Sequence, residues 1–211
     1  MNGIYAIKPK FQQALKPLEN FFVRAKIHPD IITIAAFVVS AFGGAALWLS
    51  SQPGMLWLLC TTPFVALLRT MLNALDGMVA KQTGLARPWG EVLNEIFDRL
   101  SDIAIFAGLA CSKLCSGPLL TASLISVLLS SYLGILSKAA GGQRQYGGVM
   151  GKADRMILFG LLGPLSFFCQ DVGLCPAQNV MNGFLLIVLG GALLTFWQRA
   201  AKTYADLKSI D

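Results

Sequence analysis

The sequence contains few charged side chains and a single histidine, His28, in 211 residues. Charged residues make up 13% of the chain, hydrophobic residues make up 55%, and the mean hydropathy is +0.62. A chain with so little polar surface cannot coat a soluble globule, so the composition predicts an integral membrane protein. The sequence also lacks an HExxH motif and paired CxxC motifs, which argues against a histidine-ligated zinc enzyme.

The first 30 residues lack the continuous apolar core of a cleavable signal peptide. Apolar residues recur there at three- and four-residue steps, at Phe11, Leu15, Leu18 and Phe22. This spacing predicts an amphipathic helix over residues 4–26 that lies on the membrane, loosened by Pro9 and Pro17. An N-terminal arm without this role is the alternative. We assign residues 1–28 as an amphipathic juxtamembrane segment and residues 29–211 as the membrane domain.

Six apolar segments are long enough to cross about 30 Å of hydrocarbon. They cover residues 31–49, 55–80, 89–111, 119–140, 152–168 and 180–200. Their connections are short, so we expect a bundle of six antiparallel neighbours. The predicted fold class is therefore an all-α integral membrane protein, with six transmembrane helices after the N-terminal amphipathic helix.

Lysines and arginines are distributed unequally between the two ends of these segments. With the N-terminus inside, the outer loops contain only Lys113, while the inner segments contain nearly all the other basic residues. This asymmetry predicts that both termini face the cytoplasm. The net charge of +6 then reflects topology and contact with anionic membrane lipids, and no basic patch interleaved with aromatic residues indicates a nucleic-acid partner.

One stretch, residues 73–102, gathers acidic and amide side chains between apolar segments. If it forms two helices joined by a loop, the first helix presents on one face Asn73, Asp76, Gly77 and Ala80. The second helix presents on one face Glu91, Asn94, Glu95, Asp98 and Asp102. Both faces lie near the same membrane surface and carry the hard oxygen ligands that a divalent cation prefers. The pattern therefore predicts a metal site at the inner face.

The predicted metal ligands are side-chain oxygens of this stretch, namely those of Asn73, Asp76, Asn94 and Asp98, with Glu91 or Glu95 as further candidates. Ionisable groups inside membrane spans cost on the order of 3 kcal/mol each, so they tend to line a functional cavity. The alternative is that Arg69 or Arg99 pairs with these acids and stabilises the bundle.

The same stretch resembles the signature of the CDP-alcohol phosphotransferase family, DxxDGxxAR followed after eight residues by GxxxDxxxD. The eight fixed positions, called the motif residues below, are occupied here by Asn73, Asp76, Gly77, Ala80, Lys81, Gly90, Asn94 and Asp98. The spacing fits at every position. Three identities differ, because asparagine replaces the first and third aspartates and Lys81 replaces the arginine.

The resemblance implies a membrane transferase of phospholipid biosynthesis. Such an enzyme moves a phosphatidyl group from CDP-diacylglycerol, or a related CDP-alcohol, to an alcohol acceptor and releases CMP. The resemblance further implies that Mg²⁺ or Mn²⁺, as one or two ions, is bound by Asn73, Asp76, Asn94 and Asp98. It makes Asp98 the general base as well as a ligand. The nucleotide is then bound by Asp76, Gly77, Ala80, Lys81 and Gly90, and the protein is expected to be a homodimer in a bacterial inner membrane.

The two asparagines remove negative charge from the predicted metal site. Because the affinity for hard cations depends on ligand charge, we expect weaker metal binding, or one ion where two are usual. Arg69 lies one turn before Asn73 on the same face, which makes it a candidate to neutralise substrate phosphate directly.

A second constellation lies in residues 139–155, at the inner end between two predicted spans. Five glycines free its backbone, and Arg144, Lys152 and Arg155 supply cations that suit a phosphate or another anion. Its GKADR run resembles the acceptor-side segment of phosphatidylinositol-phosphate synthase-like members, which implies a phosphorylated polyol acceptor. A flexible loop that carries inner-face basic residues is the alternative.

Two other functions are compatible with the sequence. A non-catalytic relative that binds nucleotide or lipid and acts as a membrane partner would explain the missing aspartates. A small transporter would also contain six spans and buried charge, although one half of the sequence shows no repeat of the other.

Overall fold

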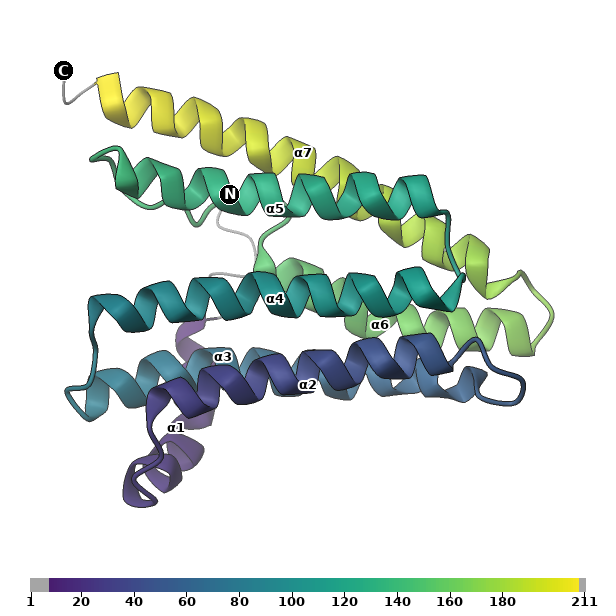
Figure 1. Cartoon of the computed structure of the whole chain (residues 1–211), viewed down its shortest axis with the longest axis horizontal. Helices are drawn as coiled ribbons and strands as arrows, with labels where there is room; N and C mark the ends of the chain where they lie inside the picture. Colours follow the sequence, from purple (N-terminus) through teal and green to yellow (C-terminus); the bar gives the residue numbers. More distant parts are fainter. Residues whose placement is uncertain (1–7, 209–211) are drawn as a thin grey trace.

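The computed structural model describes residues 8–208, which form helices joined by short loops and contain no strand. The elements are α1 (Lys8–Arg24), α2 (Pro29–Leu49), the 3-10 helix η2 (Leu56–Thr61), α3 (Thr62–Gln82), α4 (Pro88–Ser112), α5 (Gly117–Ala139), α6 (Lys152–Asp171) and α7 (Ala177–Lys208). Each of the six predicted apolar segments coincides with a long helix or with η2 and α3 together (Figure 1). The all-helical fold class is thus confirmed.

Four stretches are both long and apolar enough to cross a membrane. They are Pro29–Leu49, Leu56–Gln82, Gly117–Ala139 and Ala177–Lys208. The remaining two long helices, α4 and α6, contain 25 and 20 residues, but they carry most of the charged side chains inside the bundle. These four stretches support the prediction of an integral membrane protein.

Consecutive helices reverse direction, as the short loops predict, so helices two apart in sequence run in the same direction (Figure 1). The most extensive contacts join two such parallel pairs, α2 with α4 and α5 with α7, rather than antiparallel neighbours as expected. Small residues explain the first pair. A Cβ atom on Gly108 would lie 2.0 Å from the carbonyl oxygen of Gly44, so only glycine permits this backbone approach.

The N-terminal amphipathic helix is present as α1, which packs across α3 at the end of the bundle where α3 ends and α4 begins (Figure 1). Its apolar stripe packs against α3, and Leu15 is buried in a cluster that includes Leu75 and Val79. The helix continues through Pro17 without a break, so the expected loosening is wrong at this position. Residues 1–7 of the predicted segment lie outside the described part of the chain.

Candidate active site

The structure brings the two halves of the motif together. Asn73 and Asp76 lie on the second half of α3, and Asn94 and Asp98 lie on the first half of α4. The side-chain amide of Asn94 donates a hydrogen bond of 2.7 Å from Nδ2 to Oδ2 of Asp76. The predicted convergence of two polar helix faces is therefore observed, with Asp76 and Asn94 at the contact.

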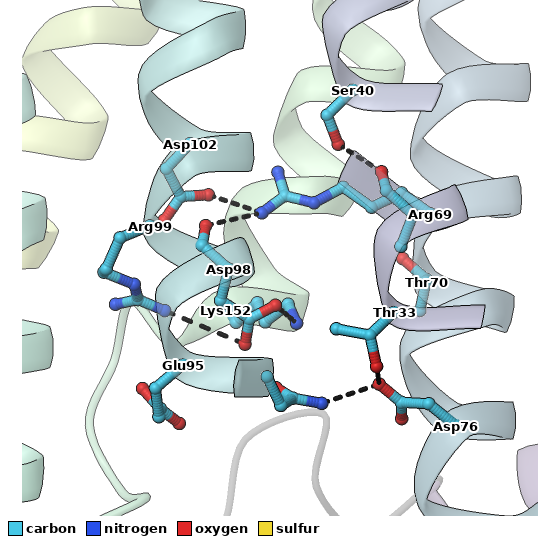
Figure 2. A network of polar contacts seen from close by, with 12 residues as sticks. Thr33, Ser40, Arg69, Thr70, Asp76, Glu95, Asp98, Arg99, Asp102 and Lys152 are labelled. Atoms are coloured by element: carbon cyan, nitrogen blue, oxygen red, sulfur yellow. Dashed lines mark hydrogen bonds and ion pairs between the residues drawn. The ribbon is translucent and has the colours of Figure 1, made fainter. Parts of the chain in front are cut away.

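Asp76 is a buried carboxylate with uncharged partners. It is 4% exposed, and its Oδ2 also accepts a hydrogen bond of 2.9 Å from Oγ1 of Thr33 on α2 (Figure 2). Its Oδ1 lies 2.6 Å from the backbone nitrogen of Gly77. Within the described residues it forms no ion pair, so its negative charge is not neutralised by a contacting cation. Burying an unpaired charge is costly, and a bound cation would remove that cost.

The donor set around Asp76 fits a hard divalent cation only if amide oxygens take part. Within residues 8–208, no group of three or more His, Cys, Asp or Glu side chains is placed to hold a metal ion. Asn73 has a buried Nδ2 atom without a hydrogen-bond partner. Turning the amide of Asn94 would present its oxygen to Asp76, because the two ends of a side-chain amide are nearly isosteric, and turning the amide of Asn73 would replace its unpartnered Nδ2 with an oxygen. Two amides and two carboxylates therefore form the candidate ligand set.

The acidic residues of α4 are paired with basic residues in a ladder, unlike Asp76. The four pairs are Glu91 with Lys138, Glu95 with Arg144, Asp98 with Lys152, and Asp102 with Arg155. The second oxygen of Asp98 lies 3.9 Å from the guanidinium of Arg99. The basic partners come from the end of α5, the following loop and the start of α6. The ladder therefore ties that segment to α4.

The deepest rung of this ladder is a buried cluster of Arg69, Asp102 and Arg155 (Figure 2 shows the Arg69 contact). Arg69 is fully buried and donates to Oδ1 of Asp102 over 2.7 Å and to the backbone oxygen of Asp98 over 3.3 Å. The expectation that Arg69 neutralises substrate phosphate is therefore wrong. The alternative, in which Arg69 pairs with an acid inside the bundle, is confirmed, because three charged side chains satisfy one another there.

The three basic residues predicted to bind an anion do not form one open site. Arg155 is 5% exposed and contacts Asp102 and the backbone oxygen of Met150. The backbone N–H at the start of α6 donates from Gly151 to Oδ2 of Asp154 over 2.8 Å, so this helix end is capped by the chain itself. Arg144 and Lys152 remain partly exposed on their acidic partners. The sequence could not show this, because spacing alone does not reveal that α4 holds an acid for each cation.

Two of the predicted nucleotide-binding residues, Gly77 and Lys81, lie on the side of α3 that faces α1. Asn73, Gly77 and Lys81 line a groove of about 480 Å³ between α3 and α1, together with Gln12 and Glu19 of α1. Of the other motif residues with this predicted role, Asp76, Ala80 and Gly90 are not among the groove residues. The contribution of α1 was missed in the sequence, where Gln12 and Glu19 only mark the polar side of an amphipathic helix.

Comparison with known proteins identifies the family. The inner membrane protein YnbA of Escherichia coli (strain K12) is 36% identical over 160 residues, which cover 76% of this chain and 78% of that protein. The phosphatidylinositol phosphate synthase of Mycobacteroides abscessus is 31% identical over 176 residues, which cover 75% of this chain and 71% of that protein. This chain belongs to the CDP-alcohol phosphotransferase family. No family model matches it.

A solved structure has the same fold as this chain. The phosphatidylinositol phosphate synthase of Mycobacterium tuberculosis with CDP-DAG bound matches with a TM-score of 0.73 at 22% identity, over 92% of this chain and 96% of that chain. The same enzyme in complex with manganese and citrate also gives a TM-score of 0.73. At this identity the match shows the fold alone. The roles of the site residues in this chain are therefore argued from the contacts that they make in its own structure.

Proposed function

We propose that this CDP-alcohol phosphotransferase moves a phosphatidyl group from CDP-diacylglycerol to an alcohol and releases CMP. The observation that carries the proposal is Asp76, a buried carboxylate without a cation partner at the junction of α2, α3 and α4. Divalent metal ions bind diphosphate groups. The carboxylate of Asp76, which forms no ion pair within residues 8–208, can bind such an ion. The relatives that are named as phosphatidylinositol phosphate synthases support the reaction class.

The metal, Mg²⁺ or Mn²⁺, would be held by Asp76 with the amide oxygens of Asn73 and Asn94, and by Asp98. When bound, it supplies positive charge beside the donor diphosphate. The manganese-bound structure of the Mycobacterium tuberculosis enzyme supports a divalent ion, and the charge lost at the two asparagines favours one ion over two.

Asp98 is the proposed general base. It sits on α4 with one oxygen on Lys152 and the other turned toward Arg99, which holds the carboxylate in one orientation. In the proposed step, the acceptor hydroxyl oxygen forms a bond to the phosphorus next to diacylglycerol, and Asp98 takes the hydroxyl proton. The bond from that phosphorus to the oxygen of CMP breaks, and CMP leaves with the electron pair.

A phosphorylated polyol is the proposed acceptor. Arg144 and Lys152 are the partly exposed cations near Asp98, and both can exchange a carboxylate partner for a phosphate. Arg155 then acts by holding Asp102, because its guanidinium is buried. The names of the relatives support this acceptor class, since they include phosphatidylinositol phosphate synthases.

The proposal also covers the membrane arrangement. We infer six spans, with α4 and α6 crossing beside the four apolar stretches, both termini cytoplasmic, and a location in the inner membrane as for the Escherichia coli relative. A homodimer is proposed as well. Gly183 and Gly190 on α7 support it, because a side chain there would meet nothing within 4 Å inside the chain.

The test of the reaction is CMP release by the purified protein. CDP-diacylglycerol is supplied with Mn²⁺ or Mg²⁺ and with a panel of alcohols that includes inositol phosphate, glycerol phosphate and their unphosphorylated forms. The expected result is CMP release only with an acceptor and only with a divalent ion. Asp98→Asn should abolish release, whereas Asp171→Asn, at the far end of α6, should leave it unchanged. Absence of CMP release with every acceptor would reject the enzyme.

A second candidate, a non-catalytic nucleotide- or lipid-binding partner, is favoured by two contacts. Lys152 already neutralises Asp98, and Asn94 donates to Asp76. Cytidine nucleotide binding without turnover, in a protein whose Asp98→Asn variant leaves cell lipid composition unchanged, would support this candidate over the enzyme.

A further inference from the structure

The turn between α6 and α7 brings two of the chain's cysteines together. Cys169 lies in the last turn of α6 and is buried, and Cys175 lies in the connection to α7 and is half-buried. The thiol of Cys169 is hydrogen-bonded to the thiol of Cys175, and both cysteines are free thiols in the structure. Their turn lies at the opposite end of the bundle from α1 and from the connection between α3 and α4 (Figure 1). The candidate active site therefore does not use this pair.

The backbone of the turn holds the two cysteines close together. Gly173 follows α6 with a φ of +70°, a left-handed conformation that favours glycine at the end of a helix. The chain then folds back, and the backbone N–H of Cys175 donates to the carbonyl oxygen of Cys169 over 3.2 Å. Standard bond lengths on either side of this hydrogen bond keep the two Cα atoms within about 7 Å of each other. A disulfide bridges Cα atoms that are roughly 4.4–6.8 Å apart, so one covalent bond can close the turn with little backbone movement.

The proposed orientation puts this turn outside the cytoplasmic membrane, and the inference rests on that part of the proposed function. The predicted outer loops contain one basic residue, Lys113, as expected for segments that have crossed the membrane. Thiols in the cytoplasm are kept reduced, whereas disulfides form and persist in the compartment outside an inner membrane. Two contacting thiols at this end of the bundle therefore meet oxidising conditions.

Two other cysteines, Cys111 and Cys115, belong to the same end of the bundle. Cys111 lies near the end of α4 and is exposed, and Cys115 lies in the connection to α5. The thiol of Cys115 donates to the backbone oxygen of Leu109 over 3.9 Å. These cysteines share the compartment of the α6–α7 turn and make different contacts, so they are a matched control for the pair.

We propose that Cys169 and Cys175 are a redox-modification site, oxidised in the membrane-inserted protein to a disulfide that closes the α6–α7 turn. The oxidant is a protein disulfide outside the membrane. The thiolate of Cys175 attacks one sulfur of that disulfide, which forms a mixed disulfide and releases the first thiol of the oxidant. The thiolate of Cys169 then attacks the sulfur of Cys175, and the second thiol of the oxidant leaves. Two electrons and the two thiol protons thus pass from the cysteine pair to the oxidant.

The test is a count of oxidised cysteines in protein taken directly from membranes. The full-length protein is denatured in N-ethylmaleimide, then reduced and treated with N-cyclohexylmaleimide, and its intact mass is measured. The wild-type protein should carry two of the second label, and Cys169→Ser and Cys175→Ser should each carry none. The double variant Cys111→Ser/Cys115→Ser should still carry two.

Unfolding of the same proteins shows whether the bond stabilises the bundle. Oε1 of Gln170 accepts a hydrogen bond of 3.0 Å from the backbone N–H of Ala177, so the turn already joins the end of α6 to the start of α7. A disulfide across this turn restrains the unfolded chain further. Reduction should therefore lower the unfolding temperature of the wild-type protein by about 5 °C and should leave that of Cys175→Ser unchanged.

A wild-type protein without the second label would overturn the inference. A second label that survives in Cys169→Ser or Cys175→Ser would overturn it as well, because a different pair would then be oxidised. CMP release tests the proposed reaction separately. A protein with this disulfide and no turnover keeps the inference and loses the proposed reaction, whereas a protein with turnover and only free thiols does the reverse.

Discussion

Asp76 on α3 and Asp102 on α4 are almost equally buried carboxylates, 4% and 3% exposed, in opposite electrostatic surroundings. Asp102 sits between the guanidinium groups of Arg69 and Arg155, whereas Asp76 accepts hydrogen bonds from a hydroxyl, an amide and a backbone N–H. A buried acid that has its own cations holds the bundle together. A buried acid without a cationic partner can bind a cation that is not part of the chain. The charge of the contacting groups therefore distinguishes the two roles, whereas burial alone does not.

Substitution at Asp76 should produce the largest loss of activity. Asp76→Asn removes a buried carboxylate that forms no ion pair within residues 8–208 and should lower CMP release by about a hundredfold or more, as removing a key electrostatic contact does. Helix packing should be unaffected, because the amide can still bond to Thr33. Initial rates of CMP release and thermal unfolding of the same sample check both parts. Retained turnover would place the metal elsewhere.

Substitution at Asp102 should instead reduce stability. Asp102→Ala leaves two buried guanidinium groups without an acid, and breaking a buried pair costs about 3–5 kcal/mol. The measurement is unfolding of the purified protein in detergent compared with wild type. Ser101→Ala, at the neighbouring buried position, is the control and should have a much smaller effect. Equal stability of Asp102→Ala and Ser101→Ala would refute the structural role of the cluster.

Lys152 offers an intermediate case, because it neutralises Asp98 at the edge of the site. Lys152→Met frees the Asp98 carboxylate, so divalent cations should bind more tightly, by about tenfold for roughly 1.4 kcal/mol of added attraction. The same variant should weaken binding of a phosphorylated acceptor. Titration with Mn²⁺ and acceptor-dependent rates separate these effects. Unchanged Mn²⁺ affinity would mean that Asp98 does not contribute to the metal site.

The outermost rung, Glu91 with Lys138, should matter least. Both side chains are more than half exposed, and solvent-exposed pairs contribute little because water and salt screen them. Glu91→Gln should leave unfolding and CMP release close to wild type. A clear loss of activity in this variant would show that Glu91 takes part in the site rather than only in the ladder.

The sequence was sufficient for the parts of the fold that depend on local patterns. Long apolar runs predicted the helices, and the spacing of the motif predicted that Asp76 and Asp98 lie on neighbouring helices. Which base pairs with which acid could not be predicted. Arg69 sits one turn from Asn73 and looks available to a ligand, yet the direction in which α4 packs turns it onto Asp102. The groove could not be predicted either, because it depends on how α1 crosses α3.

Mn²⁺ binding to wild type and Asp76→Asn, followed by electron paramagnetic resonance in the absence of nucleotide, tests the central claim most directly. If Asp76 is the carboxylate reserved for a cation, the wild-type protein should show protein-bound Mn²⁺, Asp76→Asn should lose it, and Glu91→Gln should retain it. Equal Mn²⁺ binding by wild type and Asp76→Asn would contradict the account.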